Sequence, residues 1–168
     1  MTTTDIVILA AGKGTRMKSR LPKVQHQLAG KPLLGHVLDA AHALGDSKKI
    51  VVTGHGAGAV REMYSDPSIS MVEQVEQLGT GHAVRMALPE LRENSKVVIL
   101  YGDVPLITSE TISQMLEAVT DKSIGLLTIQ LADPSGYGRI IRDSEGEIEA
   151  IVEQKDASPE QLDRKSVV

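Results

Sequence analysis

The sequence contains no cysteine, tryptophan or phenylalanine, and only three of its 168 residues are tyrosines. Without cysteine, the chain can form no disulfide bond and can offer no thiolate to a substrate or a metal ion. A cysteine-free chain is compatible with a reducing compartment, and we expect a cytoplasmic protein. Because hydrophobic residues still make up 41% of the chain, its core must be built from aliphatic side chains.

Long apolar segments and an excess of positive charge are also missing. No stretch approaches the roughly 18 apolar residues that a membrane-spanning helix needs, and the N-terminus lacks the basic and apolar regions of a signal peptide. The formal net charge of −4 argues against non-specific binding to nucleic acid. We therefore expect neither a membrane nor a nucleic-acid partner, and the length fits a single domain over residues 1–168.

An apolar run at residues 6–11 is followed by a turn that contains two glycines. The run is typical of a strand that is buried on both faces in a parallel sheet. Gly12 and Gly14 allow the backbone to approach a ligand closely, so that successive N–H groups can face an anion. Lys13 and Arg16 add positive charge beside the turn. The pattern indicates a phosphate-binding loop, although a simple tight turn explains the two glycines equally well.

Two common phosphate-binding motifs do not fit this turn. The dinucleotide-binding fingerprint requires a glycine or alanine at the position of Met17. The Walker A motif requires a Gly-Lys-Ser or Gly-Lys-Thr sequence, which does not follow Gly12 at the right spacing. The turn therefore belongs to a third type of phosphate loop, in which Arg16 supplies part of the charge neutralisation.

Two further segments offer contacts to a nucleotide. Lys23 follows Pro22, which restricts the backbone and gives the lysine a defined direction. Lys23 is a candidate to reach back over the first turn, and its alternative is a solvated surface lysine. In the loop 77–83, the glycines on either side of Thr80 would allow backbone groups to face a flat nucleobase, whereas a plain helix N-cap at Thr80 is equally compatible.

Asp103 stands at the end of the segment 96–103, whose aliphatic residues predict a strand that ends in Tyr-Gly-Asp. A carboxylate at the carboxyl end of a parallel strand lies where open α/β sheets bind their ligands. Mg²⁺ prefers one or two carboxylates together with phosphate oxygens of a substrate. Asp103 is thus a candidate magnesium ligand, and its alternative is a turn-forming or helix-capping aspartate.

The remaining apolar pattern alternates strands and helices. It predicts strands at 50–53, 69–72 and 124–129, helices at 33–44, 57–64, 83–88 and 109–119, and a hairpin of residues 139–142 and 147–152. This order predicts an α/β fold with a doubly wound, mostly parallel sheet. The first turn, Gln74, the loop 77–83 and Asp103 would then gather at one edge of that sheet.

Four motifs in this order resemble those of sugar-phosphate nucleotidyltransferases. They are residues 9–17 followed by Pro22-Lys23, residues 77–83, residues 101–106 and residues 133–140. Together they are similar to the N-terminal uridyltransferase (pyrophosphorylase) domain of the bacterial family of bifunctional UDP-N-acetylglucosamine pyrophosphorylase / glucosamine-1-phosphate N-acetyltransferases. The resemblance extends to about Asp156 and implies a Rossmann-like nucleotidyltransferase fold.

The resemblance implies a Mg²⁺-dependent reaction of UTP with N-acetylglucosamine 1-phosphate, which yields UDP-N-acetylglucosamine and pyrophosphate for peptidoglycan and lipopolysaccharide precursors. It implies that Arg16 and Lys23 are catalytic and hold the triphosphate, and that Asp103 binds Mg²⁺. Gly138 and Glu153 would hold the sugar. The substrate-binding positions that it implies are Leu9, Ala10, Ala11, Gly12, Lys23, Gln74, Gly79, Thr80, Tyr101, Gly102, Asp103, Gly138 and Glu153.

The sequence departs from the family pattern at its end. Beyond the region of Glu153, relatives continue with an Asn-Thr-Gly segment, an asparagine that is the second protein ligand of Mg²⁺, and a hexapeptide-repeat domain for acetyl transfer and formation of a homotrimer. We therefore expect a domain that is truncated at its C-terminus relative to the family. Two alternatives stay open: a fragment that binds the nucleotide with little turnover, and a nucleotidyltransferase for another base or sugar.

Overall fold

The computed structural model describes residues 3–12, 14, 17–19, 21–54 and 56–167. The chain divides into two compact units, Met1–Ala118 and Val119–Val168. Each unit has its own sheet, and the expectation of a single domain over residues 1–168 stays a prediction. None of the helices in the described part of the chain has the length and apolar character that a membrane crossing requires.

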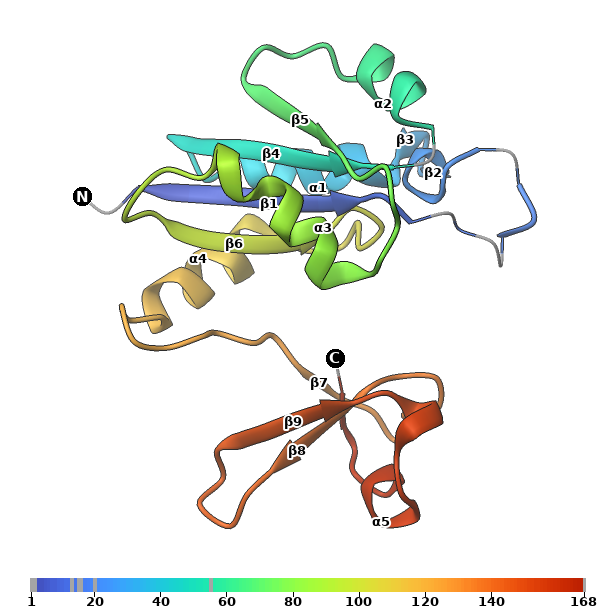
Figure 1. The fold of residues 1–168 in the computed structure, drawn as a ribbon, viewed down its shortest axis with the longest axis vertical. Helices are drawn as coiled ribbons and strands as arrows, with labels where there is room; N and C mark the ends of the chain where they lie inside the picture. The colour runs from blue at the N-terminus through green and yellow to red at the C-terminus, as the bar shows by residue number, and fades with distance from the viewer. Residues whose placement is uncertain (1–2, 13, 15–16, 20, 55, 168) are drawn as a thin grey trace. The chain divides into compact units, whose positions relative to one another are not determined.

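A four-stranded parallel sheet forms the centre of the first unit (Figure 1). Its strands are β1 (Thr4–Ala10), β4 (Ser47–Thr53), β5 (Ile69–Glu73) and β6 (Lys96–Tyr101), in the order β5-β4-β1-β6. β1 pairs with β4 on one side and with β6 on the other, and its residues Ile6, Val7 and Ile8 have no exposed surface. The prediction of a mostly parallel α/β sheet is confirmed.

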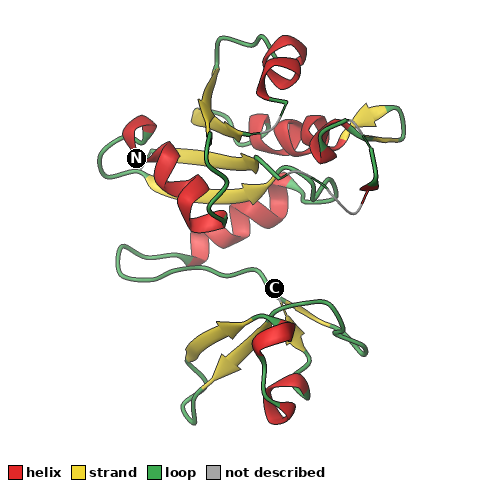
Figure 2. Ribbon diagram, turned by 45° about the vertical axis from the view of Figure 1, so that its right-hand side comes forward, coloured by secondary structure: helices red, strands yellow, loops and turns green. Residues whose placement is uncertain are grey.

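Helices cover both faces of this sheet, as Figure 2 shows. They are α1 (Leu33–His42), α2 (Ala57–Met63), α3 (Thr80–Ala87) and α4 (Ser109–Ala118), with the shorter elements η2 (Lys23–Gln25), β2 (Gln27–Leu28), β3 (Lys31–Pro32) and η3 (Leu88–Glu90). Because successive residues of a strand point to opposite faces, Ile6 and Ile8 pack in the cluster that contains α1, whereas Val7 packs with Ala83 and Ala87 of α3. The sheet is therefore doubly wound, as predicted.

The strand order creates a topological switch point between β1 and β6. From β1 the chain winds outward to β4 and β5, and it then crosses back to β6 on the other side of β1. In open α/β sheets, ligands bind outside the carboxyl ends of the strands at such a point. Gly12 follows the end of β1 and Asp103 follows the end of β6, so the fold brings two sequence-predicted site residues to the switch point.

The second unit contains a small antiparallel sheet in the order β7-β10-β8-β9. Its elements are β7 (Ile129–Gln130), β8 (Arg139–Arg142), β9 (Ile148–Val152), η4 (Gln154–Asp156), α5 (Pro159–Leu162) and β10 (Ser166–Val167). β8 and β9 form the predicted hairpin, and the Asp143 carboxylate accepts hydrogen bonds from two backbone N–H groups of its turn. The buried Arg139 guanidinium donates to the carbonyls of Pro134 and Tyr137 at 2.8 and 2.6 Å, which fixes the loop before β8.

The prediction of a buried strand over residues 124–129 is wrong. Only Ile129 and Gln130 form a strand, and they pair with β10 rather than with the parallel sheet. Ile124 is 97% exposed, and Leu127 is half-exposed. A strand needs a neighbour that completes its backbone hydrogen bonds, and an apolar run does not show which neighbour that is.

A buried carboxylate anchors the start of β1. Asp5 has no exposed surface, and it accepts hydrogen bonds from the backbone N–H and the Nε of Arg92, both at 2.7 Å, and from the Ser95 hydroxyl at 2.8 Å. Arg92 also donates to the carbonyl of Thr4 at 2.7 Å. Burial raises the pKa of Asp5, but these hydrogen bonds and the charge of Arg92 outweigh that effect, so the pKa lies below its ordinary value. The network ties β1 to the segment that leads into β6.

Replacing Asp5 by asparagine should lower the free energy of unfolding by about 1–3 kcal/mol at pH 7, because the donors around it lose their charged acceptor. The folded pKa lies below the ordinary value of 3.8, so the contribution of Asp5 is complete above that pH and is lost as the pH falls through the folded pKa. Urea unfolding should therefore show that the difference in free energy of unfolding between wild type and Asp5→Asn becomes smaller as the pH falls into the acid range. Glu62→Gln, at an exposed position of α2, is the control, and equal stabilities of wild type and Asp5→Asn at pH 7 would contradict this account.

Candidate functional site

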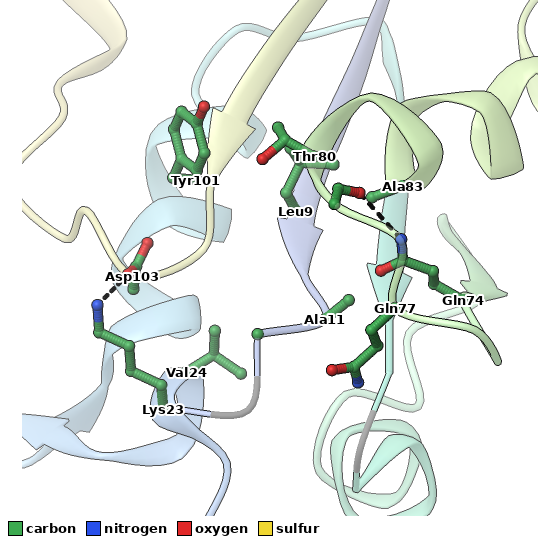
Figure 3. A pocket seen from close by; sticks show the side chains of 12 residues that line it. Leu9, Ala11, Lys23, Val24, Gln74, Gln77, Thr80, Ala83, Tyr101 and Asp103 are labelled. Atoms are coloured by element: carbon green, nitrogen blue, oxygen red, sulfur yellow. Dashed lines mark hydrogen bonds and ion pairs between the residues drawn. The ribbon is translucent and has the colours of Figure 1, made fainter. Parts of the chain in front are cut away.

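A cavity of about 330 Å³ lies at the switch point, at the carboxyl ends of β1 and β6 (Figure 3). This volume is within the range of small-molecule sites, which is about 300–1,000 Å³. The lining residues come from the ends of three strands, from η2 and from the start of α3. They are Leu9, Ala11, Gly12, Lys23, Val24, Gln74, Gln77, Gly79, Thr80, Ala83, Tyr101 and Asp103.

Most of the sequence-predicted site residues therefore lie together. Ala10 and Gly102 are buried beside the cavity and do not line it. The Gly102 N–H donates to the Leu9 carbonyl at 2.9 Å, and a Cβ at position 102 would lie 3.2 Å from that oxygen, so the absence of a side chain lets β1 and β6 end side by side. Lys13 and Arg16, the two cations of the first turn, lie outside the described residues.

Gly138 and Glu153 belong to the second unit, where the hairpin brings them together. Gly138 directly precedes β8, and Glu153 directly follows β9. Because Arg139 pairs with Val152, both residues stand at the same end of the hairpin. Gly138 is buried and Glu153 is exposed.

An ion pair between Lys23 and Asp103 lies on one side of the cavity (Figure 3). The Lys23 Nζ is 2.5 Å from the Asp103 Oδ2, and both side chains are partly exposed. Gly14, whose φ is +59°, packs against the same lysine: a Cβ at position 14 would lie 2.9 Å from the Lys23 Cβ. Lys23 thus contacts both the first turn and Asp103, instead of extending into solvent as a surface lysine would.

Asp103 has no structural role as a helix cap. Helix α4 is capped by Thr108, whose hydroxyl accepts a hydrogen bond from the Thr111 N–H at 3.2 Å. Among the described residues, Lys23 is the polar partner of the Asp103 carboxylate. The carboxylate is therefore available to a cation once Lys23 finds another partner.

The donor set around Asp103 fits a divalent cation that also binds a substrate. The described part of the chain holds no group of three or more histidine, aspartate or glutamate side chains that could bind a metal ion without further ligands. Mg²⁺ is commonly held by one or two carboxylates, water and the phosphate oxygens of a substrate. One carboxylate in a cavity of this size is compatible with that arrangement.

Gln74 stands across the cavity from the ion pair, on its uncharged side (Figure 3). It directly follows β5, is 3% exposed, and is fixed by its backbone N–H, which donates to the Thr53 carbonyl at 2.7 Å. Its side-chain Nε2 lies 3.1 Å from the Gly79 carbonyl oxygen. The alternative of an N-cap at Thr80 does not hold, because the N-cap of α3 is Gly79, with φ of +102° and no side-chain hydrogen bond.

Three lining residues were not assigned from the sequence. Val24 and Ala83 are core residues whose side chains reach the cavity wall, and nothing in their chemistry marks them. Gln77 lies in the loop 77–83, and the prediction that this loop contacts a nucleotide was the sequence signal that could have identified it. Its amide packs against the turn after β4: a Cβ at Gly54 would lie 2.7 Å from the Gln77 Nε2 and 2.7 Å from the Ala11 carbonyl oxygen.

Comparison with known proteins identifies the family of this site. Residues 6–140 match the model of the MobA-like NTP transferase domain. The chain belongs to this family. It is therefore a nucleotidyltransferase domain, and the resemblance to nucleotidyltransferases that the motifs indicated is confirmed.

Two curated relatives and one solved structure are close to this NTP transferase domain. The chain is 58% identical over 158 residues to the bifunctional protein GlmU of Saccharophagus degradans and 55% identical over 157 residues to that of Cellvibrio japonicus. Each alignment covers 94% of the chain and 35% of the relative, so the chain spans about a third of their length. HddC from Yersinia pseudotuberculosis complexed with GMP-PN is similar with a TM-score of 0.70 and 25% identity, over 89% of this chain and 68% of that one.

The close packing at Gly54 predicts a position-specific effect of an added methyl group. Gly54→Ala should lower the free energy of unfolding by about 1–3 kcal/mol, the usual cost of overpacking, because the neighbouring Ala11 oxygen is backbone and cannot move freely. Gly58→Ala is the matched control: it lies in α2 with no atom within 4 Å of the added Cβ, and it should stabilise by about 0.5–1 kcal/mol. Urea denaturation measures both, and a Gly54→Ala protein as stable as wild type would show that the turn adapts.

Proposed function

We propose that the chain transfers a uridylyl group from UTP to N-acetylglucosamine 1-phosphate, giving UDP-N-acetylglucosamine and pyrophosphate. One observation carries this proposal: a single cavity has the Lys23–Asp103 pair on one side and the Gln74 amide on the other. Such a cavity suits a ligand with a charged end and a flat, hydrogen-bonding end. The identity of 55–58% to the two GlmU proteins supports this choice of substrates.

The charged side would hold the triphosphate. A phosphate oxygen of the sugar phosphate attacks the α-phosphorus of UTP, the new P–O bond forms, and the bond to the β-phosphate oxygen breaks as pyrophosphate leaves. This chemistry depends on positioning and on charge neutralisation more than on a protein base. Lys23 and Arg16 would neutralise the phosphates, together with N–H groups of the first turn. Bound Mg²⁺ would neutralise phosphate charge further, and Asp103 would hold it.

The other side would bind the nucleoside. Gln74 would read the edge of the base, with backbone groups of the first turn and of the loop around Gly79 against its faces. Tyr101 and Gly102 would border the ribose. In the second unit, the end of the hairpin with Gly138 and Glu153 would hold the sugar. The full set of proposed nucleoside contacts is Leu9, Ala10, Ala11, Gly12, Gln74, Gly79, Thr80, Tyr101 and Gly102.

The proposed product places the chain in the synthesis of cell-wall precursors in the cytoplasm. A homotrimer formed through a hexapeptide-repeat domain belongs to the same proposal. Both follow from the resemblance to the bifunctional family and are supported by the similarity to the GlmU proteins.

A second candidate function is binding of UTP without turnover. One observation favours it: among the described residues, Asp103 belongs to no group of three or more histidine, aspartate or glutamate side chains that could hold a metal ion. A cation held by a single protein ligand would position the triphosphate less firmly than one held by two.

Pyrophosphate release separates the two candidates. The chain is incubated with UTP, N-acetylglucosamine 1-phosphate and Mg²⁺, and pyrophosphate is measured with and without EDTA, while calorimetry measures UTP binding. Release that needs all three components supports the transferase. UTP binding without release supports the second candidate, and the absence of UTP binding would refute both.

Asp103→Asn should raise the Mg²⁺ concentration needed for half-maximal UTP binding by at least about tenfold, since even outer-shell partners of metal ligands change affinity by about 10–100-fold. Stability should change little, because the Lys23–Asp103 pair is partly exposed and Asp103 caps no helix. Asp46→Asn, at an exposed position, is the control. An unchanged Mg²⁺ requirement, or unfolding of Asp103→Asn, would contradict the assigned role.

A further inference from the structure

The side-chain amide of Gln74 is held from two directions. Its Nε2 donates to the carbonyl oxygen of Gly79 at 3.1 Å and lies 3.0 Å from the Nδ1 of His82. Gly79 is the N-cap of α3, and His82 stands in the first turn of that helix. The two partners therefore come from one rigid element, which packs on the sheet through Ala83 and Ala87.

These partners fix which amide atom faces which way. A carbonyl oxygen can only accept, so the Gln74 atom that faces Gly79 must be the nitrogen. The same nitrogen lies beside the His82 Nδ1, so Nδ1 accepts the second amide hydrogen. His82 is then neutral and carries its proton on Nε2. Both hydrogens of the Gln74 amide are used, and only Oε1 is left for a ligand.

The remaining Gln74 oxygen is available to the cavity. Gln74 is almost completely buried and lines the cavity. Within the described residues, no donor reaches its Oε1, and this oxygen is not one of the fully buried atoms that lack a partner. The Oε1 atom therefore has accessible surface. Figure 3 shows this oxygen on the side of Ala11, away from the Gly79 bond. The amide thus presents an acceptor and no donor to a ligand.

We propose that His82 is a positioning residue that makes the cavity select uracil over cytosine, by holding Gln74 with its oxygen toward the base. This inference rests on the proposed function, in which Gln74 meets the base edge. Uracil has an N–H donor at N3, whereas cytosine has a lone pair there. An amide oxygen accepts from the uracil N3–H and opposes the cytosine lone pair. An amide turned by 180° would present its NH₂ group and favour cytosine.

His82 contributes to this choice because it removes the alternative. With His82 carrying its proton on Nε2, turning the amide would place Oε1 against two acceptors, the Gly79 oxygen and the His82 Nδ1, and relief at Nδ1 would require the His82 proton to move to that nitrogen. Without His82, only the Gly79 contact opposes the turned state. The preference for UTP over CTP should then fall by roughly three- to tenfold, the equivalent of one hydrogen bond.

Equilibrium binding of UTP and CTP tests the proposal. Calorimetry with Mg²⁺ gives the ratio of the two dissociation constants for the wild type and for His82→Leu, His82→Asn and Arg85→Ala. We expect the preference for UTP over CTP to decrease three- to tenfold in His82→Leu. It should be unchanged in His82→Asn, because the asparagine Oδ1 is an acceptor near the former Nδ1 position. Arg85→Ala, at an exposed position of α3, should leave the ratio unchanged. A merely structural role of His82 would weaken UTP and CTP equally, and that result would overturn the proposal.

Gln74→Ala separates this inference from the proposed function. If Gln74→Ala lowers the UTP/CTP ratio but His82→Leu does not, the base contact stands and the role of His82 is refuted. If Gln74→Ala leaves the ratio unchanged, Gln74 does not contact the base, and both the proposed base contact of Gln74 and the role of His82 are refuted. Nitrogen-15 NMR of the free chain at pH 8 gives an independent result: the Nε2–H tautomer of His82 is expected, and the Nδ1–H tautomer would overturn the proposal.

Discussion

The position of β1 between two parallel partners is the constraint on which the rest of the structure depends. β1 is buried and pairs along its length with β4 and β6. Its start is held by Asp5 and Arg92, so the strand can neither slide nor tilt without breaking a buried network. The turn that follows it must then open beside the end of β6. The cavity is a consequence of this register, because its walls continue from β1, from its partner β6, and from β5, which β4 holds beside β1.

The two sides of the cavity differ in chemistry because they come from different elements. Lys23 and Asp103 reach the cavity from the start of η2 and from the segment after β6, where their charged groups stay partly in water. Gln74 comes from the end of β5 and is packed under α3, where a neutral amide with all its hydrogens bonded is tolerated and a charge is not. The charged groups and the hydrogen-bonding amide therefore lie on separate sides of the cavity. This separation matches a nucleoside triphosphate, whose phosphates and base lie at opposite ends.

The sequence predicted those parts of the site that depend on chain order and failed where a long-range partner decides. The apolar runs before Gly12 and Asp103 indicated two strands, of which β1 is buried and β6 is a partly exposed edge strand, and the segments after them meet at the switch point as the α/β order requires. The strand at 124–129 was wrong because its backbone partner is not encoded in its own residues. The contact between Gln74 and His82 was missed for a similar reason: it crosses a loop and depends on how closely α3 approaches the sheet, which follows from the small size of Ala83 and Ala87.

The Lys23–Asp103 pair gives the free cavity one positive and one negative group whose charges balance. In the proposed function, each group would exchange its partner for a different ligand. Because the two side chains are partly exposed, a lone carboxylate or a lone ammonium group would raise the energy of the empty site only slightly. Paired at 2.5 Å, each stabilises the other. In the proposed function, a triphosphate would offer Lys23 an anion, and a divalent cation bound to that triphosphate would offer Asp103 a positive charge. Either component alone leaves one member of the pair without its partner, whereas the two together replace both halves of the interaction. If the proposed function holds, the nucleotide and the metal ion would therefore bind more readily as a complex than either one separately.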